Sequence, residues 1–445
     1  MTTATHTHHQ PFLEQYHSHP REYLQNIQNV LEQHLKDGTL HTKERLIVTP
    51  PVLTSMQHQE LRHIHQTLNT LLFSLQDRLF GGSHQKLARY AGFSEQITEL
   101  FLDPHNAQHN RTFLRGDLYH TEDGWKLTEL NVGSAIGGHH IDHIFRSLDQ
   151  TPAFQSLKAH QQRYESAWLW AEMVKGFLQD HHKPQGQTAI FDTQDSVDKY
   201  LHMYSPHAHD LTEKHGIPAQ VCAPRDLTLQ EDGLYAGSTR LDFIYRFFNL
   251  LDILHSPRDV KLVIEAWQKG LIQMPVDFRT RMYGSKAMLA LMSDPRNHGH
   301  FTDEEIKVIE NHLPWTRMLT EENLPEAQKL QGELVLKPTD GLGGLGVIFG
   351  QDLTPQAWQQ TLIERLKSSE RHVLQKQIKP SQGQLVAWSP QTGFQEDSFN
   401  LLYGAFMMNG TFSGAFLRAS PASGSKIINY ANGSFLSPVY FEGQP

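Results

Sequence analysis

The chain of 445 residues contains a single cysteine, Cys222, so no disulfide can form within it. Disulfides are typical of secreted proteins, and their absence favours a cytoplasmic protein. No uninterrupted apolar run approaches the roughly 18 residues that a membrane-spanning helix needs. The first residues also lack the charged and then apolar order of a secretory signal. We therefore expect a cytoplasmic protein without a membrane segment, in which Cys222 is a small buried hydrophobic residue and not a nucleophile.

The chain is also poor in basic residues, with 39 Lys and Arg against 48 Asp and Glu and a formal net charge of -9. Nucleic-acid binding depends on clustered positive charge, so this balance argues against a nucleic-acid partner. The HRD and DFG signatures of protein kinases and the G-x-x-x-x-G-K-[ST] loop of P-loop enzymes are absent as well. A site for a phosphorylated ligand would therefore have to be locally basic and built in another way.

The pattern of hydrophobic residues differs between regions of the chain, which predicts helices in some regions and strands in others. Apolar residues at helical spacing predict a helix over residues 20–36 and a second over residues 57–79, so the first hundred residues are expected to be mainly helical. From about residue 187, strand-like runs alternate with a helical stretch that ends near His215. This alternation predicts a small α/β layer domain. A helix around residues 286–292 and a strand meander over residues 399–440 are expected to follow.

The run TFLRGDLYHTEDGWKLTELNV predicts a β-hairpin with Asp-Gly at its turn. Side chains two positions apart on a strand share a face, so Arg115 lies with Asp117 and Glu129 lies with Asn131. Opposed carboxylates on paired strands repel each other unless a cation lies between them. Mg²⁺ prefers such carboxylate and amide oxygens, which makes Asp117, Glu129 and Asn131 candidate metal ligands. The alternative is a solvated hairpin face whose charges pair with one another.

A second candidate is the glycine-rich stretch GELVLKPTDGLGGLGVIFG. Gly341, Gly343 and Gly346 match G-x-G-x-x-G, but strand-like sequence follows them where a dinucleotide-binding fold would begin a helix. A strand ending in Lys337, a glycine turn and a second strand together predict a flap. Backbone N–H groups and an ammonium group of such a flap could cover the phosphates of ATP. The alternative is an ordinary glycine-rich hairpin.

Arg-x-Asp followed by Glu-x-Asn, here RGD and then TELN, resembles the metal-binding signature of ATP-grasp ligases. In most ATP-grasp proteins the lysine and the flap precede the Glu-x-Asn strand, whereas Lys337 follows it. The inverted order resembles the circularly permuted branch that includes glutathionylspermidine synthetase. GSKAMLALM around Lys286 resembles the lysine-bearing helix start of that branch, and HVLQKQI resembles its hinge strand next to adenine.

The resemblance implies a circularly permuted ATP-grasp fold of class α+β/α/β, with a helical N-terminal region and a small α/β layer domain. The implied domains are a mainly helical region (1–110), the metal-binding hairpin with the helices after it (111–185), the small α/β domain (186–275) and a nucleotide-binding part with the flap (276–445).

The resemblance also implies the roles of individual residues. One or two Mg²⁺ ions would be bound by Asp117, Glu129 and Asn131, and Arg115 would contact the transferred phosphoryl group. Arg418 would bind a substrate carboxylate or the reacting phosphate, with a plain surface ion pair as its alternative. The implied nucleotide-binding set is Lys286, Lys337, Gly341, Gly343, Gly344, Gly346, Gln375, Lys376, Gln377 and Ile378.

The implied reaction is an ATP-dependent ligation. The enzyme would activate a carboxylate as an acyl phosphate, release ADP, and couple the acyl group to an amine or similar nucleophile. The sequence leaves the small-molecule acceptor open among an amino acid, a peptide, a polyamine and a carrier-protein thiol. Two other functions are also left open, namely an ATP-dependent phosphotransferase on the same fold and a noncatalytic nucleotide-binding protein.

Overall fold

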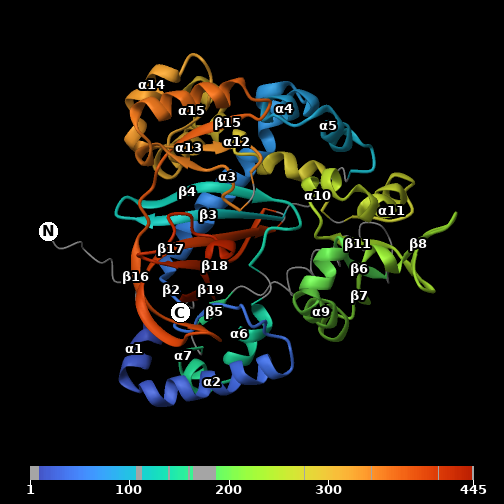
Figure 1. Ribbon diagram of the computed structural model, residues 1–445, viewed down its shortest axis with the longest axis vertical. Helices are drawn as coiled ribbons and strands as arrows, with labels where there is room; N and C mark the ends of the chain where they lie inside the picture. Colours follow the sequence, from blue (N-terminus) through green and yellow to red (C-terminus); the bar gives the residue numbers. More distant parts are fainter. Residues whose placement is uncertain are drawn as a thin grey trace.

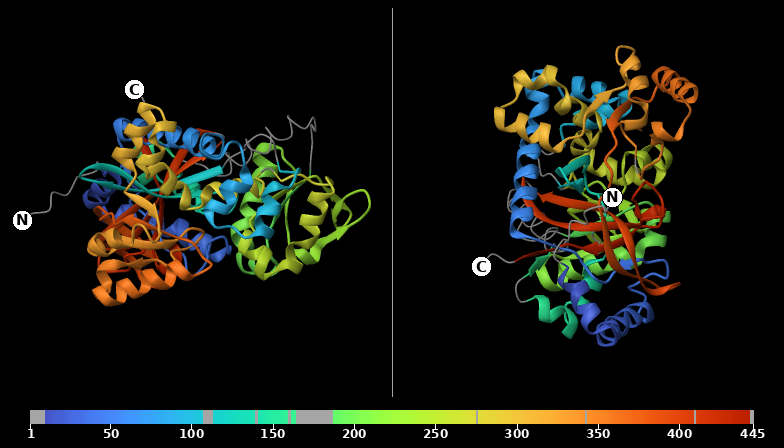
Figure 2. Two further views of the ribbon diagram at one scale, coloured as in Figure 1. Left: turned by 90° about the horizontal axis from the view of Figure 1, so that it is seen from above. Right: turned by 90° about the vertical axis from the view of Figure 1, so that its left-hand side faces the viewer.

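The computed structural model describes residues 10–106, 113–138, 141–158, 187–274, 276–341, 343–408 and 410–442, and the backbone of residues 161–163. Figure 1 shows a core sheet in the middle of the molecule, a smaller sheet with helices above it, and the helices α1, α2 and α7 below. The small α/β domain extends to one side (Figure 2). Within the described residues, no helix has both the length and the apolar character needed to cross a bilayer.

The N-terminal region is mainly helical, as predicted. The helix α2 coincides with the helix expected over residues 20–36, and α3 contains the one expected over residues 57–79. A capping box between Thr54 and Gln57 begins α3, and Gly81 ends it in the left-handed conformation. The helices of the first 158 residues are α1 (Pro11–Ser18), α2 (Pro20–Lys36), α3 (Ser55–Phe80), α4 (His84–Ala91), α5 (Glu95–Leu102), α6 (Asp142–Leu148) and α7 (Pro152–Lys158).

The core sheet has seven strands in the order β16-β1-β19-β18-β17-β3-β4. It therefore takes strands from three of the four expected domain ranges. Its strands are β1 (Leu46–Ile47), β3 (Phe113–Thr121), β4 (Gly124–Val132), β16 (Gln382–Ser389), β17 (Gly393–Met408), β18 (Thr411–Pro421) and β19 (Phe435–Pro438). A small neighbouring sheet in the order β2-β20-β5 consists of β2 (Val52–Leu53), β20 (Tyr440–Glu442) and β5 (Gln161–Arg163).

The predicted hairpin is formed by β3 and β4, and its antiparallel register pairs Arg115 with Asn131 and Asp117 with Glu129. The alternation of β3 places Leu114 and Leu118 in the hydrophobic core that α3 shares with the sheet. The odd-numbered polar residues of β3 consequently face the other side of the sheet. On that side lies the smaller sheet that covers part of the core sheet.

The smaller covering sheet, called the lid sheet below, has the strand order β12-β15-β13-β14. Its strands are β12 (Thr316–Met318), β13 (Leu334–Pro338), β14 (Ile348–Phe349) and β15 (His372–Lys376). The predicted strand–turn–strand arrangement around the glycines is confirmed, because β13 and β14 pair in antiparallel register. The helices around this sheet are α12 (Ala287–Ser293), α13 (Asp303–His312), α14 (Leu324–Lys329) and α15 (Pro355–Lys367).

The strand and helix alternation predicted from residue 187 is also confirmed. Three strands form a parallel sheet in the order β11-β6-β7, and α9 connects the last two of these. The elements are β6 (Thr188–Phe191), α9 (Gln194–His215), β7 (Ala219–Cys222), β8 (Leu227–Leu229), β9 (Leu234–Ala236), β10 (Thr239–Leu241), β11 (Phe243–Arg246), α10 (Leu250–His255) and α11 (Pro257–Gln268). Cys222 is buried, and burial raises its thiol pKa to about 12, so the thiol stays protonated near neutral pH.

Candidate functional site

A cavity of about 610 Å³ lies between the core sheet and the lid sheet. Every residue that the sequence singled out for a site lines it except Gly346. Gly346 instead has a positive φ of 73°, and a Cβ there would lie 2.8 Å from Cγ of Pro338. This glycine therefore shapes the turn at the end of β13, and the remaining candidates converge on one cavity.

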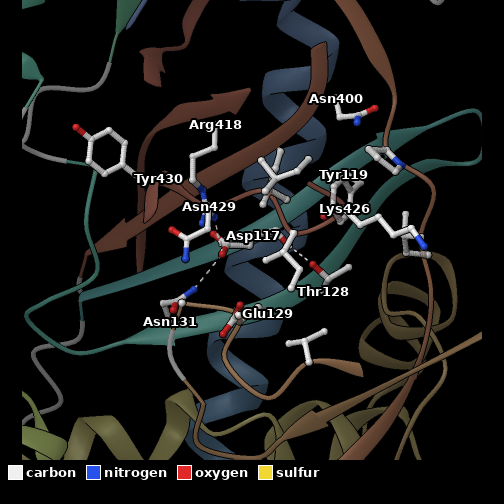
Figure 3. A pocket seen from close by; sticks show the side chains of 18 of the residues that line it. Asp117, Tyr119, Thr128, Glu129, Asn131, Asn400, Arg418, Lys426, Asn429 and Tyr430 are labelled. Carbon is white, nitrogen blue, oxygen red and sulfur yellow. Dashed lines mark hydrogen bonds and ion pairs between the residues drawn. The ribbon is translucent and has the colours of Figure 1, made fainter. Parts of the chain in front are cut away.

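Asp117 lies at the centre of the polar group on the core sheet (Figure 3). Arg115 donates to both of its carboxylate oxygens, with distances of 2.7 Å from Nε to Oδ1 and 3.1 Å from a terminal nitrogen to Oδ2. Asn131 donates its side-chain amide to Oδ2 at 3.2 Å. Burial by itself would raise the pKa of Asp117, but Arg115 and Arg418 together lower it to about 2. Asp117 is therefore ionised at neutral pH.

Arg418 reaches Asp117 from β18 across the intervening strand β17. A terminal guanidinium nitrogen lies 2.6 Å from Oδ2 of Asp117, but the angles are not those of a hydrogen bond, so the contact is an ion pair. Arg418 is 8% exposed, which contradicts the alternative of a surface ion pair. Its buried Nε makes no hydrogen bond within the described part of the chain. A buried guanidinium with an unused donor is suited to binding an anion.

Glu129 pairs with Lys286 across the cavity, at 2.9 Å between Oε1 and Nζ. Lys286 immediately precedes α12, close to the helix start expected there, and its Nζ also donates to the carbonyl of Gly341 at 3.0 Å. Burial would raise the pKa of Glu129, but Lys286 is the main cause of its net lowering. This lysine thus links the core sheet to the base of the glycine turn.

Lys337 extends from β13 of the lid sheet and has a neutral partner. Its Nζ donates to Oε1 of Gln375 at 2.7 Å, and the amide nitrogen of Gln375 donates in turn to Thr316. Burial lowers the pKa of Lys337 to about 8, the nearby Lys286 adds to this effect, and Glu129 opposes it. Within the described residues, no carboxylate forms an ion pair with this ammonium group.

Several cavity residues were missed from the sequence, and two groups of them contact the predicted site residues closely. Thr128 is the extra residue of a β-bulge in β4, and its hydroxyl donates to the carbonyl oxygen of Asp117 at 3.2 Å. The second group is the loop between β18 and β19, which contributes Ile427, Ile428, Asn429 and Tyr430 to the cavity. Its small and polar residues signal a loop, but no sequence pattern indicates which element that loop approaches.

The β18–β19 loop approaches the glycine turn closely. Gly344 has a positive φ of 80°, and a Cβ there would lie 2.5 Å from Cγ2 of Ile427. On its other side the loop is fixed by Glu44, which accepts a hydrogen bond of 2.8 Å from the hydroxyl of Tyr430. Glycine is therefore required at position 344 both for its backbone conformation and for the contact with the loop.

The donor set fits magnesium only in part. Within the described residues there is no group of three or more His, Cys, Asp or Glu side chains that could bind a metal ion. Glu129 and Asn131 supply a carboxylate and an amide oxygen on one face of β4, which are the oxygen donors that Mg²⁺ prefers. Both oxygens of Asp117 are already engaged by guanidinium and amide groups. Glu129 and Asn131 therefore fit the ion better than Asp117 does.

No protein-family model and no curated protein sequence matches the chain. The structure of a glutathione synthetase-like effector from Globodera pallida, in its apo form, aligns with a TM-score of 0.60 and 12% identity over 95% of this chain and 97% of that chain. The chain therefore shares the fold of this synthetase-like protein. The mixed α/β fold expected from the sequence is thus confirmed, whereas its circularly permuted order stays a prediction.

Two further solved structures align less well. A putative γ-glutamylcysteine synthetase from Methylobacillus flagellatus KT has a TM-score of 0.41 and 11% identity over 80% of this chain and 86% of that chain. D-alanyl-alanine synthetase A from Vibrio cholerae has a TM-score of 0.28 and 12% identity over 57% of this chain and 74% of that chain. These two similarities are too weak to support an argument about the fold or the site.

Proposed function

We propose that the protein is an ATP-dependent ligase with a circularly permuted ATP-grasp fold, which couples a carboxylate to an amine through an acyl phosphate. One observation carries the proposal. Four cationic side chains and two carboxylates, from both sheets and from the start of α12, converge on one cavity beside a glycine turn: Arg115, Asp117, Glu129, Lys286, Lys337 and Arg418. The fold shared with a synthetase-like protein is consistent with it.

The nucleotide fits between the two sheets. Lys286 and Lys337 would hold its phosphates, and Gly341, Gly343 and Gly344 line the cavity where backbone N–H groups could approach them. The cavity-lining residues 375–378 at the end of β15 would flank the adenine. A Mg²⁺ ion held by Glu129 and Asn131 would neutralise phosphate charge. Asp117, the third expected ligand, could bind the ion only by releasing one of its present partners.

The proposed chemistry has two steps. An oxygen of the substrate carboxylate attacks the γ-phosphorus of ATP, the bond to the β–γ bridging oxygen breaks, and ADP leaves. The amine then attacks the acyl carbon of the acyl phosphate, inorganic phosphate leaves, and the amine loses a proton. Arg115 and Arg418 lie where they can stabilise the negative charge on the transferred group. Neither step needs a protein nucleophile.

The charge of the cavity narrows the choice of acceptor. Among the described residues, seven cationic side chains line it, against the two carboxylates of Asp117 and Glu129, which are both paired already. The cations are Arg115, Lys286, Lys337, Lys376, Lys379, Arg418 and Lys426. A polyamine would be repelled by this lining, because no carboxylate among the described lining residues is left unpaired for its ammonium groups. An amino acid or a peptide carries a carboxylate of its own and fits better.

The decisive experiment is product analysis with Mg-ATP and a panel of amino acids and peptides. We expect ADP and phosphate in amounts that match the new amide bond, and a hydroxamate when hydroxylamine replaces the amine. AMP with pyrophosphate would refute the proposed mechanism. ADP with a stable phosphorylated substrate would identify a phosphotransferase, and nucleotide binding without turnover a noncatalytic protein. Reactions without the carboxylate control for simple ATP hydrolysis.

A further inference from the structure

The aromatic ring of Phe416 lies against both guanidinium groups of the cavity. The central carbon of the Arg115 guanidinium and that of Arg418 are each 5.5 Å from the ring centroid. Phe416 is 2% exposed and belongs to β18, two residues before Arg418. A cation within about 6 Å of an aromatic face is attracted by the electrons of the ring. Phe416 therefore contacts two cations that also share the carboxylate of Asp117.

Two glycines make room for this ring. Gly404 on the neighbouring strand β17 is paired with Phe416 on one side and with Asp117 on the other. A Cβ at position 404 would lie 2.1 Å from Cε1 of Phe416 and 2.8 Å from Cδ of Arg115. A Cβ at position 138 would lie 2.9 Å from Cζ of Phe406, which stacks on Phe416. The ring and the Arg115 side chain thus occupy the space that a side chain at 404 would fill.

One carboxylate does not hold the two guanidinium groups equally. Arg115 is already held by two hydrogen bonds to Asp117 and one to the carbonyl of Ile136. Arg418 meets Asp117 through one terminal nitrogen, so the ion pair alone leaves its guanidinium group free to rotate. The face of an aromatic ring attracts a guanidinium without using its N–H donors, so those donors stay available for an anion. We propose that Phe416 is a positioning residue that fixes Arg418 beside the anchored Arg115, with the unused donors of Arg418 directed at one anionic group of the substrate or the transferred phosphate. This role rests on the ligase function proposed above.

The test measures the binding of inorganic phosphate by calorimetry in four variants. Arg418→Gln defines the phosphate that binds at the guanidinium pair. We expect Phe416→Leu to weaken this same binding about tenfold, because two cation–π contacts are lost, and Phe416→Tyr to restore it. Phe399→Leu is the matched control, since Phe399 is equally buried on β17 and packs against Phe435. It should lower the melting temperature to a similar extent without weakening phosphate binding.

The positioning role is overturned if Phe416→Leu and Phe399→Leu bind phosphate equally well, or if Phe416→Tyr is as defective as the leucine variant. It is also overturned if the wild-type protein binds no phosphate that Arg418→Gln loses. Because phosphate binding needs no turnover, these outcomes stay separate from a failure of the ligase proposal, which product analysis detects. If the protein is a ligase, Phe416→Leu should also lower kcat/KM for the carboxylate substrate more than Phe399→Leu does.

Discussion

The charged side chains on the two walls of the cavity have different kinds of partner. On the core sheet, the carboxylate of Asp117 is shared by Arg115 and Arg418, and all three side chains are almost completely buried. On the lid sheet, the ammonium group of Lys337 donates to the amide oxygen of Gln375, its one hydrogen-bond partner among the described residues, and burial lowers its pKa to about 8. The arginines of the core sheet therefore have a buried counter-charge before any ligand binds, whereas Lys337 has none in an ion pair within the described residues.

The difference indicates that the two sheets have different roles in ligand binding. A buried charge without a counter-charge costs folding free energy, so it persists where a bound ligand later supplies the opposite charge. Lys337 is such a group, and a nucleotide phosphate would complete its environment. The core sheet instead uses paired charges to hold its arginines in place before any ligand arrives. The next four predictions test this comparison, from the largest expected effect to the smallest.

Replacing Asp117 by Asn should have the largest effect on stability. Two buried guanidinium groups would lose their shared counter-charge, and breaking a buried pair in this way costs about 3–5 kcal/mol. Denaturant unfolding measures the loss. Asp352→Asn is the control, because Asp352 and its partner Lys426 are about half exposed and their pair should contribute less than about 1 kcal/mol. Similar losses in the two variants would contradict the central position of Asp117.

Replacing Glu129 by Gln should act on turnover more than on stability. We expect turnover to fall by about two orders of magnitude or more through weakened metal binding. The free energy of unfolding should fall less than in Asp117→Asn, because the Glu129 side chain is 30% exposed and its repulsion with Asp117 disappears. Steady-state kinetics over a range of Mg²⁺ concentrations, with unfolding curves alongside, measure both effects. Unchanged turnover would exclude Glu129 as a ligand.

Replacing Lys337 by Met should weaken ATP binding without destabilising the protein. ATP affinity should fall roughly 10- to 100-fold, the expected loss for a charge-assisted hydrogen bond. The stability of the ligand-free protein should stay the same or rise, because a partly buried cation without an ion-pair partner is removed. Calorimetric titration and thermal unfolding give the two values. A clear loss of stability with unchanged ATP affinity would show that Lys337 stabilises the fold and does not bind the nucleotide.

The pKa of Lys337 predicts a pH dependence of nucleotide binding. Since the free protein has a pKa of about 8 at this site, the ammonium group is charged at pH 7 and mostly neutral at pH 9. Phosphates bind the charged form, so ATP affinity should fall about tenfold between these two pH values. The protein should also take up protons on binding ATP at pH 8.5, which calorimetry in two buffers detects. The Lys337→Met variant should lose most of this dependence, and an identical pH profile would reject the assignment.

The local parts of the site could be predicted from the sequence. Period-two alternation and an Asp-Gly turn are sufficient to place Arg115, Asp117, Glu129 and Asn131 on one face of a hairpin, and the structure has them there. The glycine turn after Lys337 follows from an equally local pattern. Local backbone preferences decide such features, so a short stretch of sequence contains the necessary information.

Contacts between distant strands could not be predicted in this way. The pairing of Asp117 with Arg418 depends on β17 lying between β3 and β18, and no pattern within any of these strands specifies its neighbours. The bulge at Thr128 could not be predicted, because the sequence TELN is also compatible with a regular strand whose side chains alternate between the two faces. The contact between Tyr430 and Glu44 likewise joins segments far apart in the sequence, and only the tertiary fold brings them together.

The strand order of the core sheet also has a consequence for synthesis of the chain. The hairpin ends at Val132, but β17, which pairs with its inner strand β3, begins only at Gly393. At ribosomal rates of about 5–20 residues per second, this interval takes on the order of tens of seconds. During that time β3 has an unpaired edge, and Arg115 and Asp117 lack the strand that buries them. Nascent chains stalled before residue 393 should therefore bind chaperones or aggregate more readily than the released, full-length protein.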